Sequence, residues 1–288
     1  MRAPVVKVTL YLPCGFGTRY PAVVLASKRR RIENVDSRVP DLYNMSRRAT
    51  ITGDDSYASR IEVLQDLYAR NSSPQLAAEA LASISLSTPS ELAVHLTLTW
   101  TTLIIAAREH PSHQAKLADV LASLALLPDA QKNAQGDPVI DHNMRVWADL
   151  PTLAWEFNYE WNGFVVPLLP GPERDATIAQ FVNINRFAAR LMATHLPAFS
   201  CFSLFALWTM RAALETPLVH VRPDQSLDAF VPAAAAWIEI LGTEVYGWDE
   251  EFEYGPLIGD GGVGGPLWDG KHGFCRERWG LWRGRGGA

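Results

Sequence analysis

Residues 200–216, SCFSLFALWTMRAALET, are apolar on nearly every side of a helical projection. A helix of this kind is buried on all sides, because water would otherwise meet apolar surface. Its charged exceptions, Arg211 and Glu215, lie four residues apart and in phase with Leu204 and Trp208. This spacing predicts a buried ion pair, which either holds the fold together or faces a ligand. Losing one partner of such a pair costs about 3–5 kcal/mol.

The stretch 175–195 carries an apolar stripe at helical spacing, and Asn185 and His195 fall within that stripe. A buried amide needs hydrogen-bond partners, so Asn185 is a candidate for a buried polar cluster. Burial shifts the pKa of a titratable side chain and can prepare it for acid–base work, so His195 is a candidate for proton transfer.

The stretch 226–247 has the same helical spacing, with Trp237 on its apolar face and Glu244 at the edge of that face seven residues later. A carboxylate in this position has a raised pKa unless a cation lies nearby. We therefore expect Glu244 and His195 to be the catalytic residues, if there is catalysis. The expected pocket or buried polar cluster consists of Asn185, Trp208, Arg211, Glu215 and Trp237, with the two tryptophans as apolar walls.

Helical patterns also fill the chain upstream. Ser73-Pro74 predicts a capped helix start, Thr88 to Glu91 has the form of a capping box, and Ser112 is placed to cap the next helix. Pro151 is expected to break the aromatic segment 142–164. We see no convincing alternation of strands and helices, so the sequence predicts an all-α fold.

The expected fold is a single multi-helix domain, residues 54–288, with about eight to ten helices and a Gly/Trp-rich C-terminal wrap. In this wrap, residues 259–282, we expect the aromatic side chains to dock on the helices. The segment contains a GxGxxG match at 259–264, and GPLWDGKH at 265–272 is one residue from a P-loop. Neither follows a credible buried strand, so neither predicts a nucleotide site.

No metal or cofactor is expected. The acidic run 249–253 loosely resembles the aspartate-rich metal motif of terpene cyclases, but the second motif of that class is absent. His110 and His113 have no third ligand in view, and the three cysteines lack the spacing of a zinc site.

Charge separates the N-terminus from the rest of the chain. Residues 1–50 contain ten Lys/Arg and three Asp/Glu, a net charge of +7, which leaves −12 of the overall −5 for residues 51–288. An acidic body argues against nucleic-acid binding. The basic segment 1–53 is expected to be a disordered tail, with a mitochondrial transit peptide, a nuclear import signal and a gene-model error as alternatives.

Four phrases carry a resemblance to a known family: WADLPTLAWEFNYEWN (147–162), FVNINRFAARLMATHLPAFSCFSLFALWTMRAALE (181–215), LDAFVPAAAAWIEILGTEVYGW (227–248) and GGPLWDGKHGFCRERWGLWR (264–283). In this order they resemble the fungal proteins grouped as domain of unknown function 3632, over about residues 54–288. The resemblance implies a helical intracellular fungal protein. It implies no reaction and no catalytic residues.

Two functions remain open. The first is a small-molecule-binding protein or cofactor-independent enzyme that acts on an apolar organic metabolite of specialised metabolism, by acid–base chemistry in an interhelical pocket. The second is a non-catalytic helical interaction module with an exposed apolar patch. No run approaches about 18 consecutive apolar residues, so no membrane partner is expected. The expected location is the cytoplasm, with the nucleus or mitochondrion as alternatives from the basic N-terminus.

Overall fold

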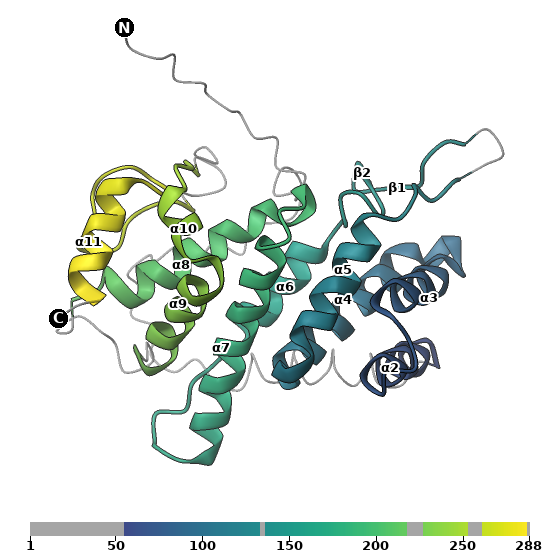
Figure 1. Ribbon diagram of the computed structural model, residues 1–288, viewed down its shortest axis with the longest axis horizontal. Coiled ribbons are helices and arrows are strands. Elements are labelled where there is room, and N and C mark those ends of the chain that lie inside the picture. Colours follow the sequence, from purple (N-terminus) through teal and green to yellow (C-terminus); the bar gives the residue numbers. More distant parts are fainter. Residues whose placement is uncertain (1–54, 133–135, 218–226, 253–260, 287–288) are drawn as a thin grey trace, which may run out of the picture.

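The computed structural model describes residues 55–132, 136–217, 227–252 and 261–286 (Figure 1). The predicted tail, residues 1–53, lies outside these ranges. The described residues form the predicted all-α fold, with one contiguous apolar core. They contain ten α-helices, in agreement with the eight to ten expected: α2 (Asp55–Tyr68), α3 (Pro74–Leu86), α4 (Leu92–Glu109), α5 (Gln114–Ala125), α6 (Leu153–Asn162), α7 (Pro172–Met192), α8 (Ser203–Leu214), α9 (Leu227–Leu241), α10 (Thr243–Gly247) and α11 (Arg276–Gly286).

The helix starts test three sequence predictions. Ser73 caps α3 as predicted, because its hydroxyl accepts a hydrogen bond from the Leu76 amide at 3.2 Å. Thr88 makes no side-chain cap, and a 3₁₀ turn, Pro89–Glu91, precedes α4 instead. Another 3₁₀ turn, Pro111–His113, replaces the predicted Ser112 cap. Proline at the first position of each turn fixes the local backbone without help from a capping side chain.

A short antiparallel hairpin, which sequence periodicity did not predict, precedes α6. Strand β1 (Ile140–Asp141) pairs with β2 (Met144–Arg145), with Ile140 opposite Arg145. His142 and Asn143 between them both have positive φ, 50° and 63°. Two consecutive residues with positive φ are typical of the tight turns that match the twist of a hairpin.

Helix α7 lies in the middle of the molecule, between the group α2 to α5 and the group α8 to α11 (Figure 1). It packs against α4 and α5 on one side and against α8 and α9 on the other. Two ion pairs join α7 to α9: Arg174 with Asp228 at 2.6 Å, and Arg186 with Glu239 at 2.8 Å. The later residue of α7 pairs with the later residue of α9, so the two helices run parallel.

Two stretches, Pro89–Glu109 and Pro197–Leu214, are long and apolar enough to cross a membrane by length and composition alone. The sequence analysis looked for uninterrupted apolar runs and found none of sufficient length. These two stretches qualify instead by their mean hydropathy, although they contain Thr or Arg. Most of each stretch is buried inside the protein. Core helices of soluble proteins pass the same test, so the two stretches are weak evidence for membrane insertion.

Candidate functional site

Asn185 is the centre of a buried hydrogen-bond cluster that joins four helices. Its Oδ1 accepts hydrogen bonds from the Trp237 indole at 3.0 Å, the Thr209 hydroxyl at 2.7 Å and the Trp161 indole at 3.3 Å. Its Nδ2 donates to the Phe181 carbonyl at 2.9 Å. An indole nitrogen can only donate, so the atom that faces the two tryptophans must be the amide oxygen. The cluster connects α6, α7, α8 and α9.

This arrangement places Asn185 inside the protein, where the apolar stripe had located it, and brings it into contact with Trp237. Trp208 immediately precedes Thr209 on α8, with its ring 5.8 Å from that of Trp161 and its indole donating to the Gly261 carbonyl at 2.9 Å. Since Oδ1 of Asn185 already accepts three hydrogen bonds, the geometry is that of a structural cluster.

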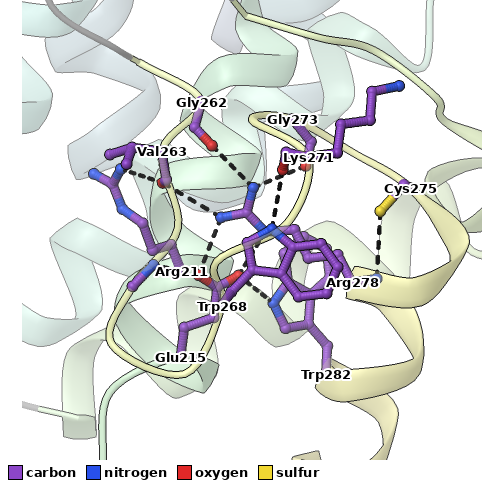
Figure 2. A network of polar contacts seen from close by, with 11 residues as sticks. Arg211, Glu215, Gly262, Val263, Trp268, Lys271, Gly273, Cys275, Arg278 and Trp282 are labelled. Carbon is purple, nitrogen blue, oxygen red and sulfur yellow. Dashed lines mark hydrogen bonds and ion pairs between the residues drawn. The ribbon is translucent and has the colours of Figure 1, made fainter.

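Glu215 is the centre of a second network, at the C-terminal end of α8 (Figure 2). Its carboxylate accepts hydrogen bonds from Arg278 Nε at 2.6 Å, Arg278 Nη2 at 3.0 Å, the Trp282 indole at 2.7 Å and the Gly265 amide at 2.6 Å. Glu215 and Arg278 are both completely buried. A bidentate arginine with two further donors is the arrangement that compensates a buried carboxylate.

Arg278 also binds the backbone of the wrap. Its Nη1 donates to the carbonyls of Gly262 at 3.0 Å and Gly273 at 2.8 Å, and its guanidinium lies over the rings of Trp268 and Trp282. The predicted docking of the wrap is therefore correct for Trp282 and for Phe274, which are buried. One arginine holds both sides of the wrap against α8.

The predicted buried ion pair between Arg211 and Glu215 is wrong, because Glu215 pairs with Arg278 instead of Arg211. Arg211 is only half-buried, and its Nη1 donates to the Val263 carbonyl at 2.9 Å. Arg278 lies 63 residues beyond Glu215 in sequence. Helical periodicity relates residues on one helix, so it could not indicate this partner. In sequence Arg278 looks like one of several surface arginines.

Glycines allow the wrap to lie this close to the protein. A Cβ on Gly273 would lie 1.9 Å from the Glu250 carbonyl oxygen, and one on Gly262 would lie 2.2 Å from the His272 carbonyl oxygen. A Cβ on Gly265 would lie 2.7 Å from the Cβ of Glu215. Gly265, the first glycine of the near P-loop, therefore serves close packing against Glu215, and Gly262 and Gly273 on either side of that motif serve close packing against the backbone. The described residues 261–275 form turns rather than a strand that leads into a phosphate-binding helix.

His195 is nearer to solvent than the sequence predicted, and Glu244 belongs to a separate helix. Helix α7 ends at Met192, and His195 has a left-handed backbone, φ 58°, with an exposed side chain. Gly242, at φ 54°, ends the run of α9, and Glu244 belongs to α10 with a partly exposed side chain. The two side chains do meet, with His195 Nδ1 3.6 Å from Glu244 Oε1. The burial predicted for His195 is wrong because α7 ends before this residue, whereas the partial exposure of Glu244 agrees with its predicted place at the edge of an apolar face.

Glu250 is a partly buried carboxyl group next to the start of α8. Burial raises its pKa above the ordinary value, while the Ser203 hydroxyl, which donates to Glu250 Oε2 at 2.7 Å, and nearby Lys271 act in the opposite direction. Its neighbour Asp249 pairs with Lys271 at 2.6 Å. Within the described ranges no three His, Cys, Asp or Glu side chains are grouped to hold a metal ion.

The loop between α6 and α7, residues 163–171, exposes an apolar surface. Val165 is 71% exposed, Leu168 65% and Leu169 80%. We refer to this segment as the apolar loop. The sequence carried a signal for it: FVVPLLP has no polar residue, and its prolines prevent it from being a buried helix or a central strand.

Comparison with known proteins gives a match to a family model. A family model described as "Protein of unknown function (DUF3632)" matches residues 100–285. The chain belongs to this family. The DUF3632 match starts within α4 and ends within α11, so it includes both polar clusters and the apolar loop, while α2 and α3 lie outside it. No curated protein and no solved structure matches the chain.

Proposed function

We propose that this member of the DUF3632 family is a non-catalytic helical interaction module that binds a partner protein through the apolar loop. The observation that carries the proposal is the exposure of three large aliphatic side chains, Val165, Leu168 and Leu169, within five residues. Single exposed apolar residues are ordinary, whereas a contiguous group of them is typical of a binding surface.

The base of the loop is anchored, which keeps these side chains directed outward. Arg174 donates from Nη1 to the Pro167 carbonyl at 2.7 Å and from Nη2 to Asp228 at 2.6 Å. Phe164, at the start of the loop, packs edge-on against Phe181 with ring centroids 5.4 Å apart. Proline at positions 167 and 170 restricts the backbone further. A preorganised loop loses less conformational entropy on binding.

Charge next to the loop favours a particular kind of partner. Glu173 and Asp175 follow the loop in the first turn of α7, and both are exposed. These carboxylates would be repelled by an anionic lipid surface. They fit a protein groove that is apolar inside and carries Lys or Arg at its rim.

The alternative, acid–base chemistry on an apolar metabolite, has less support from the same residues. Asn185, Glu215 and Trp237 are engaged in hydrogen bonds that hold helices together. His195 is exposed and Glu244 is partly exposed, so neither has the apolar surroundings that would prepare it for proton transfer.

The test uses the double variant Leu168→Asp/Leu169→Asp, with Leu126→Asp as a matched control at an exposed leucine after α5. A partner is isolated by photo-crosslinking from position 165 and purified, and its affinity for each variant is measured by calorimetry. Burial of a leucine contributes about 1.5–3 kcal/mol, so the double variant should lose at least about tenfold in affinity. The control should bind normally. Equal binding by both variants would contradict the proposal.

A further inference from the structure

The last turn of α11 carries two exposed arginines next to glycines that packing does not explain. Arg283 and Arg285 are both exposed, and residues 283–287 read RGRGG. Gly284 is exposed as well, and a Cβ placed on it would meet no atom within 4 Å. Glycine disfavours a helix more than any residue except proline. Its presence here weakens the end of the helix without any gain in packing.

The anchor of α11 lies before this turn. The buried Trp282 donates to the Glu215 carboxylate at 2.7 Å, and the buried Arg278 binds the same carboxylate. Beyond the anchor, Arg285 Nη2 donates to the Thr216 carbonyl at 3.3 Å, in an exposed position. Helix ends fray, because their last carbonyls have no partner within the helix. The turn that contains both arginines can therefore open while the anchor stays in place.

We propose that Arg285 is a substrate for an enzyme that methylates arginine. It is the one arginine of the chain with glycine on both sides. An enzyme that modifies arginine has to bind the planar guanidinium between carboxylates, in a narrow site that excludes bulky neighbours. Glycine on each side has no Cβ to obstruct this approach, and it lets the backbone adopt an extended form at no steric cost.

The reaction balances with a sulfonium methyl donor as the co-reactant. An Nη nitrogen of Arg285 attacks the methyl carbon, so a C–N bond forms, the C–S bond breaks and the donor leaves as a neutral thioether. The proton lost from the nitrogen passes to a base of the enzyme. The guanidinium keeps its charge but loses an N–H donor. Because the hydrogen bond to Thr216 is exposed, the modified protein should keep its melting temperature.

The same helix contains a matched arginine for comparison. Arg276, in the first turn of α11, is also exposed, but its neighbours are Cys275 and Glu277. Both neighbours carry a Cβ. The carboxylate of Glu277 would also be repelled by the carboxylates that bind a guanidinium. Methylation should therefore distinguish two exposed arginines of one helix.

The test uses the full chain, an arginine methyltransferase that is active on Gly-Arg-Gly peptides, and isotope-labelled S-adenosylmethionine. The synthetic peptide LWRGRGGA, residues 281–288, is treated in parallel. We expect label on Arg285 in the peptide and in the full chain, and none on Arg276, as located by peptide mass spectrometry. Arg285→Lys should lose this label. Gly284→Ala should slow the reaction of the full chain by about fivefold or more, because alanine holds the last turn in the helix.

The inference is independent of the function proposed for the apolar loop, so Leu168→Asp/Leu169→Asp should be methylated at the normal rate. A full chain that takes up no label while the peptide does would overturn the inference, because α11 would then protect Arg285. A peptide that takes up no label would overturn it too, since the sequence itself would not be recognised. So would equal labelling of positions 276 and 285, or a rate that Gly284→Ala leaves unchanged.

Discussion

Removing either partner of the buried pair Glu215–Arg278 should destabilise the protein much more than removing the neighbouring Arg211. Glu215→Ala leaves the guanidinium of Arg278 buried without its counter-ion, although two carbonyl contacts remain. Arg278→Ala leaves the carboxylate with the donors of Trp282 and Gly265 among the described residues. Each change should lower the free energy of unfolding by about 3–5 kcal/mol. Arg211→Ala removes the hydrogen bond from this half-buried side chain to the Val263 carbonyl and should cost about 0.5–1.5 kcal/mol.

The coupling between the residues is the sharper measurement. Because the second change removes a charge that is already uncompensated, the double variant Glu215→Ala/Arg278→Ala should lose about 2–3 kcal/mol less than the sum of the single losses. The cycle of Glu215 with Arg211 should give a clearly smaller coupling. Urea unfolding followed by tryptophan fluorescence measures all five variants. If a single variant fails to fold, Glu215→Gln and Arg278→Lys provide milder cycles.

The reasoning would be refuted if Glu215→Ala cost less than about 1 kcal/mol, which is below the range for breaking a buried pair. A coupling with Arg211 as large as that with Arg278 would also refute it. Either result would mean that the carboxylate is accessible to water in solution.

Two further predictions concern the C-terminal wrap and its contact with Glu250. Gly273→Ala should strongly lower the melting temperature, because its Cβ would lie 1.9 Å from the Glu250 carbonyl oxygen. The control Gly280→Ala has open space in α11 and should stabilise the protein by about 0.5–1 kcal/mol. Similar melting temperatures for the two variants would count against the close approach. Burial raises the pKa of Glu250 from its ordinary 4.5, so the folded state holds this proton to higher pH and the carboxyl lowers stability as the pH rises through that pKa. Glu250→Gln keeps an acceptor for Ser203 and should therefore gain in melting temperature relative to the unsubstituted chain as the pH rises above 4.5. Exposed Glu251→Gln is the control, and a gain that does not change with pH would contradict the assignment.

Sequence periodicity predicted the local features of the fold well. It located the helices, the burial of Asn185 and the cap at Ser73, because each depends on residues within a few turns of one another. It failed where helical periodicity was extended past the end of a helix. Gly242 inside the pattern 226–247 was a usable signal for the end of α9, since glycine commonly terminates helices. With that break, Glu244 would have been assigned to a separate helix.

The long-range contacts of the polar clusters were beyond sequence reasoning. Glu215 was correctly predicted to be buried and paired. Its partner, however, can come from four residues away on the same helix or from 63 residues away in the sequence, because folding brings either one within reach. The partner is chosen by the approach of the wrap to α8, which depends on the close packing at Gly265 and Gly273. A single sequence contains no record of that approach.

The sequence separation of Glu215 and Arg278 has a consequence for synthesis of the protein. Ribosomes add roughly 5–20 residues per second, so the 63 residues between the two take about 3–13 s to make. During that interval α8 can leave the exit tunnel with a carboxylate that no cation compensates. A nascent chain halted before Arg278, by a premature stop codon or a frameshift, would keep that defect permanently. Such a product should be recognised by chaperones and proteases, even though α2 to α9 had been synthesised in full.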